Sequence, residues 1–235
     1  MYGREINGQE HTFGVSGKLI KNALVMYDHQ TDTLWSQFLR QGIKGELAGT
    51  ELEVIPVTQT TWAAWLELHP DTLSLNKNGR YSSDTCNGYY SGGRAGVIGE
   101  ANVDERLNTK EMVVGVDLGG NTKANPFKTL AQLQVVNETF SGNDILVFFD
   151  GGTGTALVYD RNVGGRDLTF QIEGEPSGVQ TILTDEETGS TWSAFTGRAI
   201  DGELKGQTMD RALSHLSFWF VWTDWNPDTE LYTGW

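Results

Sequence analysis

The chain has 235 residues, of which 38% are apolar, and its formal net charge is −14. This length allows a substantial core, and the acidity disfavours nucleic acid and anionic membrane surfaces as partners, because both need a basic face. The single cysteine, Cys86, excludes an intrachain disulfide, and no stretch approaches the ~18 apolar residues of a membrane span. The first residues lack the basic and then apolar pattern of a signal peptide.

The sequence resembles itself when it is shifted by 157 positions, which places Trp35 on Trp192 and Trp62 on Trp219. From Tyr2 to Thr72, 21 of 71 positions are identical without a gap. Such self-similarity is typical of a repeated supersecondary unit. We therefore predict an α+β, mainly β fold with two pseudo-symmetric repeat units around a shared core. The predicted ranges are 1–75 for the first repeat, 76–125 for an inter-repeat loop and strand, and 126–235 for the second repeat.

In the first repeat, short β-branched and aromatic runs predict four strands. They are His11–Val15, Leu24–Asp28, Leu34–Phe38 and Leu52–Val57. A short helix is expected at Thr60–Leu68, where Trp62, Trp65 and Leu66 have the i, i+3, i+4 spacing of one apolar stripe. Pro70 should terminate this helix, because proline disfavours a helical residue before it.

Between the repeats, Asn76–Gly99 is polar and glycine-rich and predicts a long surface loop, and Met112–Leu118 predicts a buried strand. Pro126–Leu133 predicts a helical turn with proline at its first position. A hairpin signal follows, with strands at Ile145–Asp150 and Ala156–Tyr159 around the turn Gly151–Gly154.

The second repeat has the order of the first. Its predicted elements are Leu168–Glu173, Gln180–Thr184, Thr191–Phe195 and a helix at Ser217–Trp225 that ends before Pro227. The hairpin has no counterpart in the first repeat, so that repeat is expected to lack about thirty initial residues. The strand Tyr2–Phe13 would then expose an unpaired edge, and we expect this edge to support a homo-oligomer.

The repeated signature Asp-x-x-Thr-x-x-x-Trp-Ser has a structural and a functional interpretation. In the structural one, the Asp and Thr side chains bond to turn backbone and the Trp enters the core. In the functional one, the signature binds a ligand through its Thr, Trp and Ser side chains. These candidates are Thr31, Trp35, Ser36, Thr188, Trp192 and Ser193.

The repeated carboxylates are the catalytic candidates. Asp28 and Asp185 could face each other across a pseudo-twofold axis and act as general acid and base, or hold a divalent cation. Metal-ligating candidates come instead from residues that break the repeat, namely His11, His29 and Cys86. The cofactor would then be a divalent or transition metal ion; the alternative is that there is none.

At these motifs the chain resembles the uncharacterised family known as domain of unknown function 3179. The matching stretches are Thr12–Gly17, Tyr27–Gln37, His69–Thr72, Gly152–Gly154, Thr188–Trp192 and Asn226–Thr229. The resemblance implies an exported or lipoprotein context in bacteria and archaea, and a metal or redox role for a Cys-Pro-x-Cys-like motif in the first-repeat hairpin. This chain lacks that hairpin, and the equivalent positions of the second repeat are Asp150 and Thr153.

Three functional hypotheses follow. The first is an extracytoplasmic binding or structural module for a small polar ligand or metal ion, because no catalytic signature occurs. The second is an ester or glycoside hydrolase with carboxylates between the repeats. The third is a copper or other transition-metal protein that uses the histidines, Met26 or Cys86.

Overall fold

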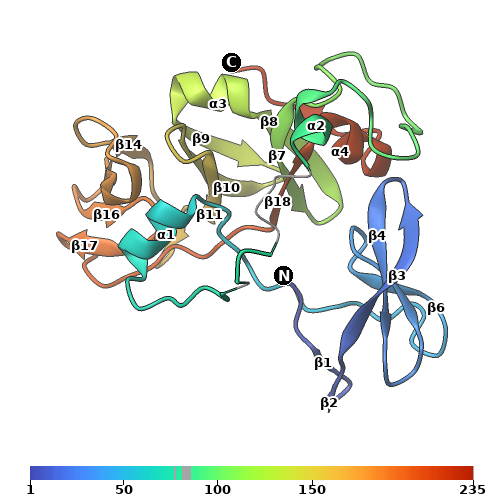
Figure 1. Ribbon diagram of the computed structural model, residues 1–235. Helices are drawn as coiled ribbons and strands as arrows, with labels where there is room; N and C mark the ends of the chain where they lie inside the picture. The colour runs from blue at the N-terminus through green and yellow to red at the C-terminus, as the bar shows by residue number, and fades with distance from the viewer. Residues whose placement is uncertain (77, 81–85, 235) are drawn as a thin grey trace. The chain divides into compact units, whose positions relative to one another are not determined.

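The computed structural model describes residues 1–76, 78–80 and 86–234 (Figure 1). Strands account for 39% and helices for 13% of the chain, which confirms the mainly β class. The described residues form four α-helices and several small, mostly antiparallel sheets.

The chain divides into two compact units, each built from separate segments. Unit 1 comprises Met1–Val57, Gly88–Glu111 and Ser217–Asp228; unit 2 comprises Thr58–Asn87, Met112–Leu216 and Thr229–Trp235. These units differ from the contiguous ranges of the sequence repeats. The helix α1 (Trp62–Leu68), which follows the sheet of the first repeat along the chain, belongs to unit 2. The helix α4 (Trp219–Trp225), which follows the sheet of the second repeat, belongs to unit 1. The repeat boundaries themselves stay a prediction.

Unit 1 contains a four-stranded antiparallel meander in the order β3-β4-β5-β6. Its strands are β3 (Phe13–Ile20), β4 (Ala23–Asp28), β5 (Leu34–Ser36) and β6 (Gln41–Lys44), preceded by the small hairpin of β1 (Glu5–Ile6) and β2 (Gln9–Glu10). Ile6, Trp35 and Leu52 form its buried core. The predicted strand Leu52–Val57 is wrong, because only Val54 forms a bridge, to Tyr2, and Pro56 has no N–H to donate.

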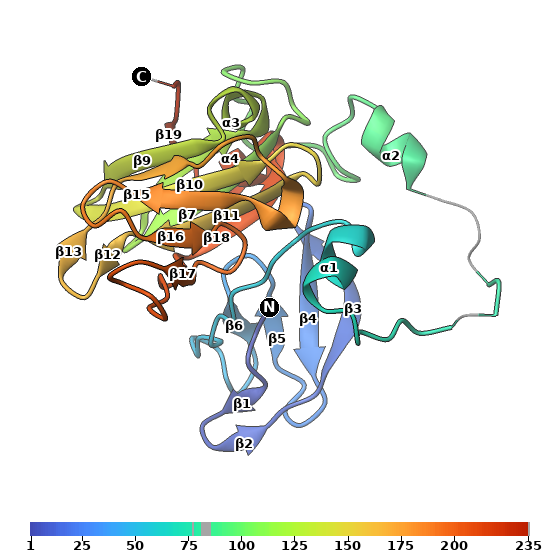
Figure 2. The same ribbon diagram turned by 90° about the vertical axis from the view of Figure 1, so that its left-hand side faces the viewer.

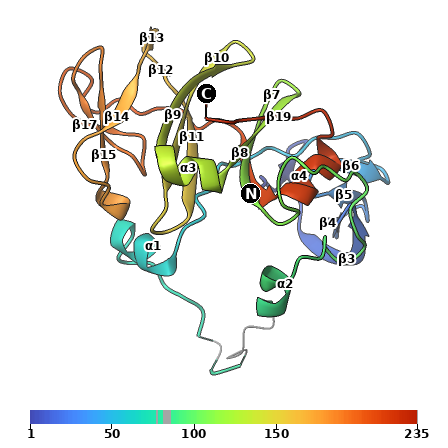
Figure 3. The same cartoon turned by 90° about the horizontal axis from the view of Figure 1, so that it is seen from above.

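The helix α4 (Trp219–Trp225) packs against the loop after β5 in unit 1. Phe38 stacks on Trp225 with ring centroids 5.1 Å apart, and Lys21 Nζ donates to the carbonyl of Asp224 at 2.5 Å. Figure 3 shows α4 beside β5 and β6. The short helix α2 (Asn87–Ser91) lies in the predicted loop Asn76–Gly99, of which residues 77 and 81–85 lie outside the described residues.

Unit 2 contains the predicted strand and hairpin. One sheet has the strand order β18-β7-β8-β19. Its strands are β18 (Ser214–Phe218), β7 (Met112–Leu118), β8 (Asn121–Pro126) and β19 (Glu230–Leu231), and β19 runs parallel to β8. In β18, only Ser214–Leu216 belong to unit 2. A second sheet has β9 (Val135–Phe140), β10 (Asn143–Asp150) and β11 (Thr155–Asp160). Between them in sequence lies α3 (Phe127–Leu133), which contacts β10 (Figure 1). Pro126 is its N-cap rather than its first residue.

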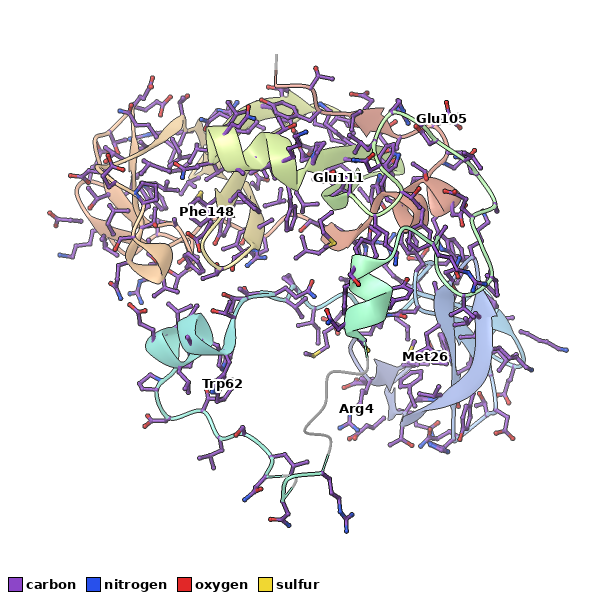
Figure 4. The ribbon with its side chains drawn as sticks, turned by 45° about the horizontal axis from the view of Figure 1, so that its top comes forward. Arg4, Met26, Trp62, Glu105, Glu111 and Phe148 are labelled. Atoms are coloured by element: carbon purple, nitrogen blue, oxygen red, sulfur yellow. The ribbon has the colours of Figure 1, made fainter. Side chains whose placement is uncertain are left out.

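The repeated sheet of unit 2 is also a four-stranded meander. Its strands are β14 (Phe170–Ile172), β15 (Ile182–Asp185), β16 (Thr191–Ser193) and β17 (Ala199–Asp201); the hairpin β12 (Asn162–Val163) with β13 (Arg166–Asp167) and the 3-10 turn η1 (Gly178–Gln180) lie nearby in the chain. One buried cluster joins this sheet to β10 and β11, and Figure 2 shows β15 and β16 across these strands. Phe148, labelled in Figure 4, belongs to this cluster.

The helix α1 (Trp62–Leu68) covers part of the same cluster in unit 2. Thr61 caps it by accepting the N–H of Ala64 at 3.2 Å. The predicted apolar stripe is wrong, because Trp62 is 50% exposed while Ala64 is buried and Leu68 packs on the cluster (Figure 4). The side chain of α1 that enters the core is therefore small.

Candidate functional site

Asp28 ends β4 and closes the turn to β5. Its Oδ1 accepts the backbone N–H of Thr31 at 2.6 Å, and its Oδ2 accepts the indole N–H of Trp35 at 2.9 Å. Burial would raise the pKa of Asp28, but hydrogen bonds from Trp35, Thr31 and His11 outweigh it and lower the pKa to about 2. The turn therefore holds Asp28 in its charged form.

Asp185 makes the same contacts between β15 and β16 in unit 2. Its Oδ1 accepts the N–H of Thr188 at 2.6 Å, and its Oδ2 accepts the indole N–H of Trp192 at 2.8 Å. Both oxygens of Asp28 and of Asp185 are thus engaged within their own turns, which accounts for the repeated signature structurally. The two residues belong to different units, and their action as a catalytic pair stays a prediction.

The other residues of the signature lie in the interior or in tight turns. Trp35 and Trp192 are completely buried. The hydroxyl of Ser36 accepts the N–H of Leu39. In the same way, the hydroxyl of Ser193 accepts the N–H of Thr196 at 3.4 Å. These contacts describe structural roles, and ligand binding by Thr31, Thr188, the tryptophans and the serines stays a prediction.

The predicted metal ligands lie in dissimilar surroundings. His11 is 2% exposed and places Nδ1 3.4 Å from Asp28 Oδ1, whereas His29 is exposed and packs edgewise on Tyr27. Cys86 is exposed and belongs to unit 2, while both histidines belong to unit 1. Among the described residues, no three His, Cys, Asp or Glu side chains are grouped to hold a metal ion. Metal binding by these residues stays a prediction.

A third turn of the same kind occurs at the end of β10. Asp150 Oδ2 accepts the N–H of Thr153 at 2.9 Å and its hydroxyl at 2.5 Å. The Thr153 hydroxyl lies 2.6 Å from that of Thr155, which donates to the hydroxyl of Thr60 at 2.9 Å. A chain of three hydroxyls therefore connects the carboxylate to the segment before α1.

The third turn lacks the indole donor of the other two. Each tryptophan follows its aspartate by seven positions, and the residue at that offset from Asp150 is Leu157, which is fully buried and has no side-chain donor. Within the part of the chain that the structure describes, Asp150 Oδ1 receives no hydrogen bond and forms no ion pair, although the residue is only 6% exposed. Buried carboxylates are normally paired, so Asp150 carries an unused acceptor.

A hollow of about 220 Å³ lies beside this turn, entirely within unit 2. Gln59, Thr60, Thr61, Met112, Phe127, Thr153, Gly154 and Leu216 line it. Three hydroxyls and one amide supply its polar wall, and a methionine, a phenylalanine and a leucine supply its apolar wall. A site with one apolar and one hydrogen-bonding wall is typical of small-molecule binding.

A buried amide lies close to the hollow in the sequence. Asn125 is the penultimate residue of β8, two residues before Phe127; it is fully buried, and both its amide nitrogen and its amide oxygen lack a hydrogen-bond partner. Such groups are uncommon in native proteins and call for a bound water or another polar partner. Asn125 therefore carries two unsatisfied polar atoms in the interior of unit 2.

The sequence contains the components of this site, but it does not show that they come together. The turn Gly151–Gly154 was predicted as a hairpin turn, which is confirmed by the pairing of Asp150 with Thr155. The signal that could have distinguished Asp150 is the third Asp-x-x-Thr-x-Thr/Ser pattern, which lacks tryptophan at the seventh position. The hollow itself depends on segments that are distant in the sequence.

Comparison with known proteins adds a family without an assigned activity. The sequence pattern of the family described as Protein of unknown function (DUF3179) matches residues 1–229. No curated protein and no solved structure matches the chain. Among the described helices, none combines the length and apolar character needed to cross a bilayer.

Proposed function

Because the chain belongs to the DUF3179 family, for which no function is recorded, the function has to be argued from the site, and we propose that the protein is a binding module for a small polar ligand. The ligand would occupy the hollow of unit 2. The observation that carries this proposal is the unused acceptor of Asp150, joined through Thr153 to the polar wall of the hollow.

The size of the hollow limits the ligand. Its volume of about 220 Å³ corresponds to about seven waters at ~30 Å³ each, below the ~300 Å³ at which sites for drug-sized molecules begin. A ligand of a few heavy atoms would place its hydrocarbon part on Met112, Phe127 and Leu216 and its polar part on the threonine hydroxyls.

The contact between Asp150 and Thr153 does not by itself indicate a nucleophile and its base. The same carboxylate–hydroxyl contact occurs in both other turns, where Thr188, for example, lies 2.8 Å from Asp185 Oδ1. In those two turns the contact between threonine and aspartate stabilises the turn, and both oxygens of the aspartate accept hydrogen bonds. This comparison favours binding over catalysis, and the hydrolase and transition-metal hypotheses gain no specific observation.

We also propose that the two halves arose by internal duplication and are pseudo-symmetric. The supporting observation is that equal contacts recur at positions 157 apart, such as the indole bonds of Trp35 and Trp192 at 2.9 and 2.8 Å. The helices α1 and α4 also begin and end at positions with this offset. On this proposal, Asp150 belongs to a third copy of the turn, in which leucine has replaced the tryptophan that donates to the aspartate in the other two copies.

The binding proposal is tested by screening small alcohols, amides and amines with heteronuclear NMR. Binding in the hollow should shift the amide signals of Thr61, Thr153 and Gly154. It should also raise the melting temperature by about 3–6 °C at ten times Kd, because about 1.4 kcal/mol of binding energy then stabilises the folded state.

A filled hollow provides the matched control. Gln59 is exposed at the rim, so Gln59→Trp can place an indole in the hollow without disturbing the core. Gln207→Trp makes the same change at an exposed position that does not line the hollow. We expect the first variant to lose binding and the second to keep it. Equal binding by both variants would refute the hollow as the site.

A further inference from the structure

We propose that the free edge of β3 in unit 1 is a docking site for an extended strand of another protein, which presents an asparagine side chain to the backbone of Phe13. The strand β3 is the outermost of its sheet, so one of its sides has no neighbouring strand. This docking site is separate from the hollow of unit 2 and does not depend on it. Unit 2 contains an edge of the same kind that is already covered.

In unit 2, one amide side chain closes the outer edge of β14. Asn137 of β9 donates to the carbonyl of Phe170 at 2.8 Å and accepts the N–H of Phe170 at 2.9 Å. Val135 lies two residues before Asn137, and therefore on the same face of β9, and it packs against the buried cluster that includes Phe170. An asparagine and an apolar residue two positions away thus cover this edge.

Phe13 of β3 has the position in the sheet of unit 1 that Phe170 has in unit 2. Phe13 lies opposite Asp28, and Phe170 lies opposite the equivalent Asp185. Each phenylalanine packs edgewise on the buried tryptophan of its own sheet, with ring centroids 5.8 and 5.5 Å apart. The two edges are therefore built alike, and the group that closes one indicates what the other can accept.

The backbone N–H and C=O of Phe13 point away from the sheet of unit 1. The N–H of Asp28 donates to the carbonyl of Thr33, on the side of β5. The next N–H, that of His29, donates to the carbonyl of Thr12. Phe13 and Asp28 are therefore a non-hydrogen-bonded pair of the antiparallel ladder. Within the described ranges, no group bonds to the N–H or C=O of Phe13, so the amide that closes the edge in unit 2 has no counterpart here.

The exposure of the side chains shows the same difference between the two edges. Phe170 is 2% exposed, whereas Phe13 is only half-buried. Ile172 packs against the buried cluster of unit 2, whereas its equivalent in unit 1, Val15, is 70% exposed. Phe13 and Val15 share one face of β3, so they form an apolar strip beside the open backbone groups. A partner with an apolar residue two positions from its asparagine would cover this strip.

The open part of β3 is short and has a positive charge at its end. A bulge interrupts the pairing with β4 between Val15 and Lys18, and bulges of this kind limit the addition of a further strand. The ammonium of Lys18 forms no ion pair in the part of the chain that the structure describes, and the equivalent position of unit 2 holds Glu175. Lys18 therefore favours a partner with a carboxylate near its asparagine.

A second copy of this chain fits the edge less well than a different protein does. In a second copy, Asn137 already bonds to its own Phe170. The strand Phe13–Ile20 contains no asparagine or glutamine, so two β3 edges cannot supply the amide to each other. The covered edge of unit 2 thus defines the partner by its chemistry, as a strand with an asparagine, an apolar neighbour on the same face and an acidic residue.

The test supplies such a strand at high effective concentration. A copy of residues 133–141, which contain β9, is fused to Met1 of the full chain through a flexible Gly/Ser linker of about 20 residues, which spans about 25 Å. The matched control has Asn137→Leu in the fused copy only, which keeps the size of the side chain and removes both hydrogen-bonding groups. Hydrogen exchange of the Phe13 amide is measured by NMR in these two proteins and in the parent.

We expect the fused strand to slow exchange of the Phe13 amide at least about tenfold, because the asparagine oxygen accepts its N–H. With Asn137→Leu in the copy, exchange should stay within about twofold of the parent. The Phe170 amide, which already bonds to Asn137, should exchange equally in all three proteins and is the internal control. Val15→Asp in the fused protein should remove the protection, whereas Leu19→Asp, beyond the bulge, should keep it.

Three results would overturn the proposal. Equal protection by the asparagine and leucine copies would show that apolar contact alone docks the strand, without a role for the amide. No protection by either copy would show that the edge of β3 does not accept such a strand. If the Phe13 amide of the parent becomes protected as the protein concentration rises, a second copy covers the edge and the proposed partner is wrong.

Discussion

Removal of the indole donor in unit 1 provides the sharpest test of how the repeated turn is stabilised. Trp35→Phe keeps an aromatic ring in the core but deletes the N–H that lies 2.9 Å from Asp28 Oδ2. The contact with the ring of Phe13, at 5.8 Å, can persist. The hydrogen bond to the buried carboxylate, by contrast, is lost, and Asp28 has no exposed surface through which water could replace it.

The magnitude follows from the pKa of Asp28. The shift from 3.8 to about 2 corresponds to at most about 2.4 kcal/mol at ~1.36 kcal/mol per pH unit, and solvent screening around the turn reduces this. Because the folded-state pKa is lowered, this stabilisation is present above about pH 4 and is lost as the pH falls toward 2. We expect Trp35→Phe to cost about 1.5–2.4 kcal/mol at pH 7, which lies in the lower part of the range for hydrogen bonds to charged groups.

The assay combines urea denaturation at pH 7 and pH 2.5 with NMR titration of the Asp28 carboxyl carbon. In the variant, the pKa of Asp28 should rise, and the stability difference from the parent should be smaller at pH 2.5 than at pH 7. Trp62→Phe makes the same change at a half-exposed tryptophan outside the turn and is the control. An unchanged pKa, or a stability loss of the same size at both pH values, would show that the indole acts through packing alone.

Two further predictions concern the backbone and the core of unit 2. Gly202→Ala should destabilise by more than about 2 kcal/mol, because a Cβ there would lie 2.6 Å from the Cα of Ser190 at φ +94°. Gly206→Ala, at φ +92° with open space around it, should cost about 1 kcal/mol, and equal losses in thermal unfolding would contradict the steric argument. Asn125→Leu should leave stability unchanged or raise it by about 1 kcal/mol, since it removes two unsatisfied buried groups. A clear loss in urea denaturation would indicate instead that a bound water or ligand holds the amide.

Local patterns predicted the elements that local chemistry determines. The glycine-rich turn after Asp150, the strand Met112–Leu118 and the helix after Pro126 are each encoded within a few residues, and the structure places them as expected to within one or two residues. The strand β8 is not predicted, because four of the six residues of Asn121–Pro126 are polar and the strand ends in proline. Its burial comes from its partners β7 and β19, which sequence periodicity does not report.

The candidate site was harder to predict for a similar reason. Trp35 and Trp192 were recognised as repeated core residues, yet the informative position is Leu157, where the repeat would have required a tryptophan. The hollow combines the chain before α1, the start of β7, the start of α3 and the turn after β10. Only tertiary structure brings these segments together, so sequence alone could not show that Asp150 has an acceptor near a hollow.

The assignment of α4 to unit 1 has a consequence for biosynthesis. Unit 1 contains Met1–Val57, but it also requires Ser217–Asp228, which are synthesised only after Met112–Leu216 of unit 2. Until then Phe38 lacks the indole of Trp225 on which it stacks. Domains commonly fold from the N-terminus during synthesis. Here the sheet of unit 1 must wait until Met112–Leu216 of unit 2 have been synthesised, and a premature stop before Trp219 would leave this sheet without α4.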